Sequence, residues 1–142
     1  MRTQYSRANH MSDYLRRLQA QEPHRVPFDV VESVRHALPG EPSLELVDRA
    51  LRRLNLHTYA DHAVQIYCRI AELEPLTLDP DQQLTFWRHF THVVRVWPAA
   101  KSFLPYPYLA EQLLRFQDID AHPFVVPIKL QNRQDVSQPS KM

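Results

Sequence analysis

His89 and His92 are the two side chains whose spacing could support metal chemistry. Three residues apart on a helix, two imidazoles can reach one zinc ion, but a structural zinc site normally takes four ligands. Further ligands would have to come from His57, His62 or Cys68, and no motif such as His-Glu-x-x-His surrounds the pair. We therefore predict no metal site and interpret both histidines as surface residues of a helix.

A reactive cysteine or paired carboxylates would indicate an enzyme. Cys68 is the single cysteine and lies among apolar residues, and His62, six positions earlier, is not on the same helical face. The carboxylate pairs at 72–74 and 79–81 lie at the ends of predicted helices. We predict that the protein is not an enzyme and needs no cofactor. A metal-dependent enzyme built on the histidine pair is the most distant alternative.

Basic residues could bind nucleic acid, but the formal net charge of +1 argues against a protein that depends on phosphate contacts. The densest basic cluster is Arg49, Arg52 and Arg53. Glu45 and Asp48 precede the first two by four residues and should partly neutralise them on a helix. Any DNA binding should therefore be weak and sequence-tolerant, and should use these three arginines. A GC-rich coding bias would give the same enrichment in arginine.

Aromatic side chains concentrate in a short stretch that begins at Phe86. At helical spacing they are typical of a core, although an exposed aromatic side chain could serve as a binding hot spot. Phe86 and Trp87 are neighbours and cannot both occupy the centre of one helical stripe, so one should lie at the edge of the core. We assign that role to Phe86 and predict a partner-binding set of Phe86, Tyr59, Phe103 and Tyr106.

These residues must be positioned by helices. The chain has 12 prolines and 1 glycine, which excludes glycine-rich phosphate loops and argues against tight hairpins. We predict an all-α fold, a single compact domain of five to six helices. The predicted helices lie near 11–21, 27–38, 44–54, 58–73 and 80–97, with the last one after residue 106.

The helix from Pro80 has the strongest signals. Asp79 should cap it, Pro80 suits the first position, and Gln82 completes a capping box. Its apolar stripe is predicted to be Leu84, Trp87, Phe90, Val94 and Trp97. The last helix should start near Pro107 and bury Leu109, Leu113 and Phe116.

The chain is predicted to divide into three parts. Residues 1–26 form a polar N-terminal segment with one weak helix, 27–128 a helical domain, and 129–142 a disordered polar tail. No apolar run reaches the roughly 20 residues that a membrane span needs. A single cysteine is typical of a reducing, intracellular compartment.

Three blocks occur in order: residues 47–62, residues 76–84, and 101–109 (Lys-Ser-Phe-Leu-Pro-Tyr-Pro-Tyr-Leu) followed by Leu113-Leu114. This order resembles the C-terminal helical region of the late transcription factor 3-like proteins of poxviruses and other large DNA viruses. The resemblance covers about residues 44–128. The family usually has a Cys-rich zinc-binding segment upstream, which one cysteine cannot form. As determinants of fold and partner binding, the resemblance implies Tyr59, Phe103, Leu104, Tyr106 and Leu113.

The resemblance implies a non-enzymatic, transcription-associated factor that acts through protein contacts and weak DNA contacts. The alternative is a structural or assembly adaptor, such as a small virion component, that uses a helical interaction domain. A transcription factor of this kind would work in the cytoplasmic viral factory or the host nucleus, and an adaptor would enter the virion. The sequence leaves the partner and the oligomeric state open.

Overall fold

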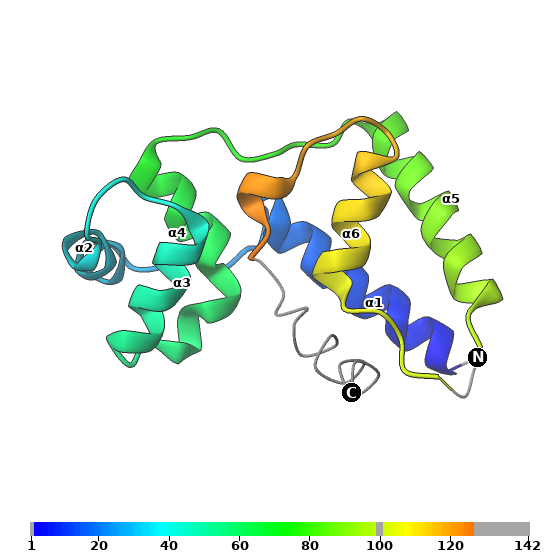
Figure 1. Ribbon diagram of the computed structural model, residues 1–142, viewed down its shortest axis with the longest axis horizontal. Coiled ribbons are helices and arrows are strands. Elements are labelled where there is room, and N and C mark those ends of the chain that lie inside the picture. The colour runs from blue at the N-terminus through cyan, green and yellow to red at the C-terminus, as the bar shows by residue number, and fades with distance from the viewer. Residues whose placement is uncertain (1, 99–100, 127–142) are drawn as a thin grey trace, which may run out of the picture.

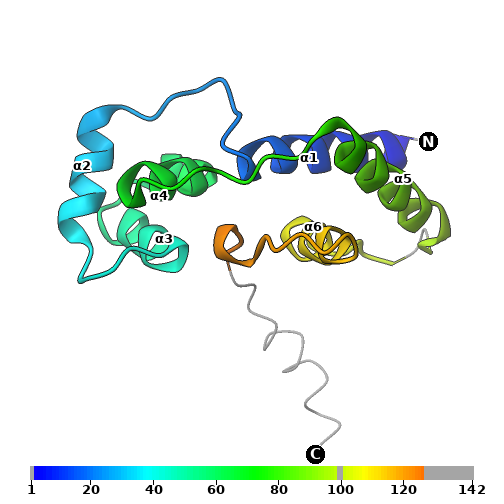
Figure 2. The same ribbon diagram turned by 90° about the horizontal axis from the view of Figure 1, so that it is seen from above.

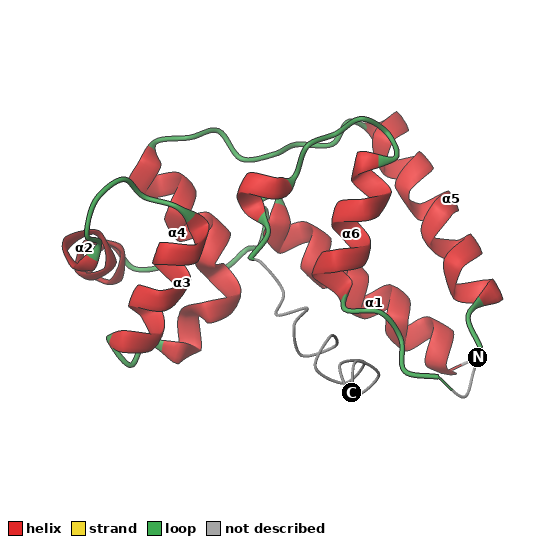
Figure 3. Ribbon diagram, in the orientation of Figure 1, coloured by secondary structure: helices red, strands yellow, loops and turns green. Residues whose placement is uncertain are grey.

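The described chain is helical. The computed structural model describes residues 2–98 and 101–126, with side chains from residue 7 onward. This part holds six α-helices, two short 3₁₀ helices and no strand (Figure 3). The elements are α1 Arg2–Leu18, α2 Phe28–Ala37, α3 Leu44–Arg53, η1 His57–His62, α4 Ala63–Ala71, α5 Pro80–Val96, α6 Tyr106–Arg115 and η2 His122–Phe124. The predicted all-α fold is confirmed, and the predicted tail at 129–142 lies outside the described residues.

The helices form two groups, each with its own hydrophobic cluster. Helices α2, α3 and α4 lie at one end of the molecule, and α1, α5 and α6 lie at the other (Figures 1 and 2). The α2–α4 cluster includes Val26, Val31, Val34, Leu44, Val47, Leu51, Ile66 and Ile70. The α1–α5–α6 cluster includes Met11, Leu15, Leu18, Phe86, Phe90, Val94, Leu109, Leu113 and Leu114. Helix α1 also contacts α4 and so joins the two groups.

Helix α1 is longer than the weak helix predicted for this segment. It starts at Arg2 rather than near Met11, because the polar stretch before Met11 contains no proline or glycine to break a helix. Ser12, whose hydroxyl would suit the N-cap of a helix that starts near Met11, therefore lies inside α1 instead. Met11, Leu15 and Leu18 are buried and follow one helical face. The predicted boundaries of the three chain segments stay a prediction, but α1 supplies part of a hydrophobic cluster.

Just after four of the helices comes a residue in the left-handed conformation, and none of these residues is glycine. They are Ala20, Asn55, Glu72 and Asp118, with φ between 55° and 62°. After α6, the Asp118 N–H donates to the Arg115 carbonyl at 2.8 Å and the Ile119 N–H donates to the Leu114 carbonyl at 2.9 Å. These two bonds satisfy carbonyls that the helix end would leave unpaired. The fold thus makes its sharp helix ends without glycine.

The predicted helix 58–73 is divided in two. The 3₁₀ helix η1 covers His57–His62, and α4 begins at Ala63. The break falls at His62, whose φ of −107° and ψ of 21° depart from the α-helical values. Thr58, whose hydroxyl would suit the N-cap of the predicted helix, therefore lies inside η1 and does not cap α4.

The predicted start of α5 is confirmed. The Gln82 N–H donates to Asp79 Oδ1 at 2.7 Å, and the Asp79 N–H donates to Gln82 Oε1 at 2.9 Å. Both bonds of the capping box are present, with Pro80 at the first helical position. The observed first residue of α5 is therefore the predicted one.

The predicted rotation of α5 is partly wrong. Phe86, Phe90 and Val94 are buried, with Phe86 0% exposed, whereas Trp87 is half-buried and Leu84 is 58% exposed. Phe86 was assigned to the edge of the core, but Trp87 occupies that position. Both stripes contain Phe90 and Val94, so helical periodicity alone could not choose between them.

Helix α6 buries Leu109 and Leu113 as predicted. Phe116 was expected on the same face but is 74% exposed, because the helix ends at Arg115 and the chain turns away. Its ring instead lies against His89, with the ring centres 5.1 Å apart.

The 3₁₀ helix η2 lies between the two helix groups (Figure 2). Phe124 packs against both clusters, and its ring centre is 6.3 Å from that of Tyr67. On the other side, His122 Nδ1 lies 3.1 Å from Oε2 of Glu111 on α6. The segment that follows α6 therefore closes the gap between the groups.

Candidate functional site

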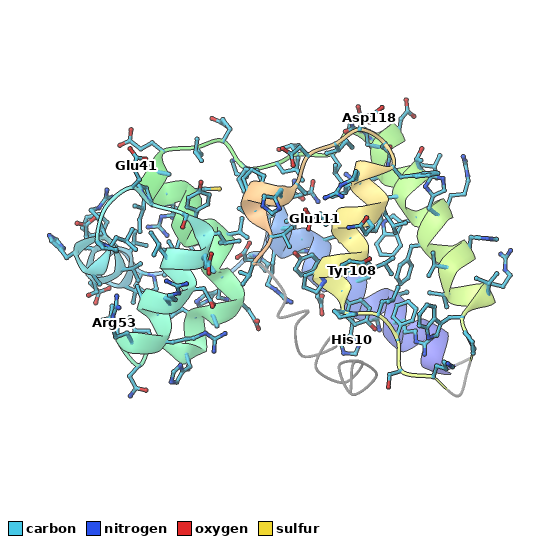
Figure 4. The ribbon with its side chains drawn as sticks, in the orientation of Figure 1. His10, Glu41, Arg53, Tyr108, Glu111 and Asp118 are labelled. Carbon is cyan, nitrogen blue, oxygen red and sulfur yellow. The ribbon has the colours of Figure 1, made fainter. Side chains whose placement is uncertain are left out.

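The predicted nucleic-acid residues lie together on the exposed side of α3. Figure 4 shows Arg53 on this helix, at the end of the molecule away from α5. Arg49 Nη2 donates to Glu45 Oε2 at 2.9 Å, and Arg52 Nε donates to Asp48 Oδ2 at 3.0 Å. Both ion pairs join residues one helical turn apart and neutralise much of the charge that α3 could offer to phosphate.

Two of the predicted partner-binding residues meet in the segment before α6. The Phe103 ring packs near those of Phe90, Trp97 and Tyr106, with centre-to-centre distances of 6.2, 5.6 and 5.7 Å. The Arg7 guanidinium lies over the Phe103 ring at 4.3 Å, a cation–π contact. Phe103 therefore helps to hold α1 beside this segment.

The other two predicted partner-binding residues lie elsewhere. Tyr59 is half-buried in η1 and packs against the α2–α4 cluster. Phe86 lies on the buried side of α5, is fully buried, and cannot reach a partner in this conformation. The predicted set is therefore divided between the two helix groups.

A partly open groove with a volume of about 280 Å³ lies between the helix groups. Most of its lining is apolar, with Arg17 and Asp61 as the charged residues. The residues that line this central groove are His10, Tyr14, Arg17, Leu18, Leu44, Ala60, Asp61, Ala63, Val64, Tyr106, Pro107, Phe124 and Val126. Three elements far apart in sequence, α1, η1 and α6, thus form one concave surface.

The hydroxyl groups of Tyr14 and Tyr106, the two tyrosines of the central groove, are uncharged at neutral pH. Burial, together with the negative charge of Glu111, raises the pKa of Tyr14 above its usual range, and Arg17 opposes this shift. Burial also raises the pKa of Tyr106. Both side chains therefore present a neutral hydroxyl and an aromatic ring, which suits contact with a protein surface.

A polar network beside the groove was missed by the sequence analysis. The Glu22 side chain is 6% exposed, and its Oε2 lies 2.8 Å from His62 Nδ1 and 3.1 Å from Gln65 Nε2. Gln65 Oε1 also accepts a hydrogen bond from the Val26 N–H at 2.8 Å. The signal in the sequence was a glutamine inside the otherwise apolar face of α4. This network holds the loop between α1 and α2 against α4.

The histidine pair on α5 has no further ligand-type side chain grouped with it among the described residues. The His89 ring packs against that of Phe116, with the ring centres 5.1 Å apart, whereas His92 is exposed. Among residues 2–98 and 101–126, no group of three or more His, Cys, Asp or Glu side chains could hold a metal ion. Burial raises the pKa of the Cys68 thiol to about 11, so at neutral pH it is a neutral, unreactive thiol.

The sequence matches a family model described as Poxvirus Late Transcription Factor VLTF3 like, over residues 2–136. The chain belongs to this family. The match extends beyond residues 44–128, to which the sequence resemblance pointed, and includes α1. No curated protein and no solved structure shows significant similarity to the chain.

Membership in the VLTF3-like family suggests a role in viral late transcription, and the family is not known for enzymes. In this VLTF3-like chain, Tyr106 and Leu113 hold α6 in the α1–α5–α6 cluster, and Tyr59 packs on the other cluster. In the part of the chain that the structure describes, no helix is long and apolar enough to cross a membrane.

Proposed function

We propose that this chain is a non-enzymatic factor in the late transcription of a large DNA virus and that it acts through contacts with other proteins. The family match over residues 2–136 carries the transcriptional part of the proposal. The central groove supports the protein contacts, because it is concave, largely apolar and contains Tyr106, a residue type enriched at protein interfaces. Such a factor would work inside the infected cell, in the viral factory or the nucleus.

DNA contact is secondary in this proposal. The three arginines of α3 are exposed, but Arg49 and Arg52 are paired with acidic side chains. Arg53 donates a hydrogen bond to the Ala37 carbonyl at 3.4 Å. A surface of this kind would bind DNA weakly, by its phosphates and without regard to base sequence.

Affinity capture of the full chain from cells that express viral late genes, with and without nuclease, tests the proposal. We expect proteins of the transcription machinery to stay bound after nuclease treatment. Loss of every partner on nuclease treatment would mean that nucleic acid tethers them. Capture of virion structural proteins alone would instead identify an assembly adaptor.

A pair of tyrosine variants tests the groove. Tyr106 lines the central groove, whereas Tyr108, two positions later on α6, does not. Tyr106→Ala should weaken the nuclease-resistant capture, and Tyr108→Ala should leave it in place. An equal effect of both substitutions would show that the groove is not the contact surface.

A further inference from the structure

One side of α5 is largely exposed and is not covered by the other helices that the structure describes. Helix α5 lies at the end of the molecule away from α2, and it packs against α6 (Figures 1 and 2). Its buried side bears Phe86, Phe90 and Val94. The opposite side, which we name the α5 outer face, borders an open hollow of about 480 Å³. It consists of Leu84, Trp87, Arg88, Thr91, His92 and Arg95.

The α5 outer face carries positive charge that no described residue neutralises. Arg88 and Arg95 are exposed, and no ion pair or hydrogen bond joins either side chain to another described residue. The acidic residue of α5 is Asp81, in the first turn. Seven residues of helix place the two arginines about 10 Å apart along the axis and on the same side. They differ in this from Arg49 and Arg52 on α3, which are both ion-paired.

The same face exposes apolar surface next to these charges. Leu84 is 58% exposed, and Trp87 is half-buried at the edge of the core. The Trp87 ring is held in place by edge contacts with Phe86 and Phe90, at 5.4 and 5.3 Å between ring centres. A rigid tryptophan beside arginine is the composition most enriched among binding hot spots.

We propose that the α5 outer face binds an acidic amphipathic segment of a partner protein. Carboxylates of that segment would pair with Arg88 and Arg95, and its large apolar side chains would cover Leu84 and Trp87. This inference rests on the proposed function, for which it supplies the chemistry of one partner. A nucleic acid fits less well, because a phosphate backbone would use the two arginines and leave the exposed Leu84 uncovered.

Two double variants test the charge requirement directly. Arg88→Gln with Arg95→Gln removes two charges from the α5 outer face, and Arg49→Gln with Arg52→Gln removes two from α3. The probe is a fluorescein-labelled peptide of about four helical turns, with Leu and Phe on one face and Asp and Glu on the other. Binding to the full chain is followed by anisotropy, and circular dichroism confirms that both variants are folded.

We expect the α5 double variant to weaken peptide binding roughly tenfold or more. In the unaltered chain, peptide carboxylates would form ion pairs with Arg88 and Arg95, whose charges no described residue compensates. The α3 double variant should bind within about twofold of the unaltered chain, since its arginines are already paired. In a two-dimensional NMR spectrum, the indole N–H signal of Trp87 should shift on peptide addition and that of Trp97 should not. Trp87→Phe assigns the two signals.

Several results would overturn the inference. If the two double variants weakened peptide binding equally, the effect would come from the net charge of the protein and not from the α5 outer face. Absence of peptide binding would exclude an acidic segment as the occupant. If duplex DNA bound to the α5 outer face and this binding required Arg88 and Arg95, while peptide binding did not, the face would be a nucleic-acid surface. The proposed function is judged separately by nuclease-resistant capture, which can succeed through the central groove even when this peptide fails.

Discussion

His62 Nδ1 lies 2.8 Å from Oε2 of Glu22, across 40 positions of sequence. Glu22 belongs to the loop after α1, and His62 stands at the start of α4. Gln65 extends the contact, because it bonds both to Glu22 and to the backbone N–H of Val26. The loop that leads from one helix group to the other is therefore held by side-chain hydrogen bonds, of which the bond to Val26 is buried and the two to Glu22 are partly buried.

Gln65→Ala should lower the free energy of unfolding by about 1–3 kcal/mol, because the buried Val26 N–H would lose its acceptor. Urea denaturation measures the change. Gln112→Ala is the control, since that half-buried side chain makes no hydrogen bond to another described residue, and it should shift stability by no more than about 0.5 kcal/mol. Similar losses for both glutamines would contradict the role given to the network.

Phe86→Ala and Trp87→Ala should differ in cost. Phe86 is fully buried, so its truncation should cost about 3–5 kcal/mol. Trp87 is half-buried, and its truncation should cost about half as much, since less apolar surface leaves the core. Denaturant midpoints of the two variants decide the matter. A larger loss for Trp87 would restore the stripe predicted from sequence and refute the observed rotation of α5.

Glu72→Gly should stabilise the protein. Glu72 has a φ of 55°, a conformation that costs an L-residue roughly 1–2 kcal/mol, whereas glycine adopts it freely. After the entropy that glycine loses on folding, a net gain of about 0.5–1 kcal/mol is expected. Ser33→Gly, at an exposed position inside α2, should instead destabilise by a similar amount. A melting temperature that falls in both variants would exclude strain at Glu72.

Cys68 should resist alkylation in the folded protein. Burial raises its thiol pKa from 9.0 to about 11, so near pH 8 the folded state holds very little thiolate. Iodoacetamide should therefore react slowly with the native chain and quickly after urea unfolding, as followed by mass spectrometry. Rapid labelling of the native chain would show that the helix around Cys68 opens readily.

The same thiol makes stability depend on pH. Between pH 9 and 11 the unfolded state has lost the Cys68 proton while the folded state keeps it, so the unfolded state binds fewer protons. The contribution of Cys68 to stability is full below this window and is lost as the pH rises through it. Cys68→Ala should flatten that part of the stability curve in urea titrations at stepped pH.

DNA binding, where it is measured at low salt, should fall steeply as salt is added. Three or four phosphate contacts give a slope of log affinity against log salt of about −3 to −4. Substituting Arg52 and Arg53 together by glutamine should flatten that slope by about 2. Binding that is unaffected by this double substitution, or that stays tight at about 200 mM salt, would locate the DNA surface elsewhere.

Periodicity and capping signals predicted much of the fold. The Asp79–Gln82 box located α5, and the prolines before residue 108 located α6. The rotation of α5 was not predictable, because Leu84, Phe86 and Trp87 are all apolar and the choice depends on how α6 packs.

The candidate surfaces were harder to predict from the sequence than the helices, because they are formed by tertiary contacts. The pairing of Arg49 and Arg52 follows from their spacing and was predicted, whereas the unpaired state of Arg88 and Arg95 depends on what surrounds α5. The central groove joins residues from α1, η1 and α6, and no local pattern in the sequence indicates that these segments meet. Likewise, Gln65 was visible as a polar residue in an apolar stripe, but its partners were not.

The ring of Phe124 packs on both hydrophobic clusters, and the next two residues divide between them, Val125 on one and Val126 on the other. Neither cluster can bury its full apolar surface until this segment has docked. During synthesis, when the chain leaves the ribosome from its N-terminus, the helices emerge before the turn that completes both cores. The nascent protein therefore stays partly open, with apolar surface accessible to chaperones, until residue 126 has cleared the exit tunnel.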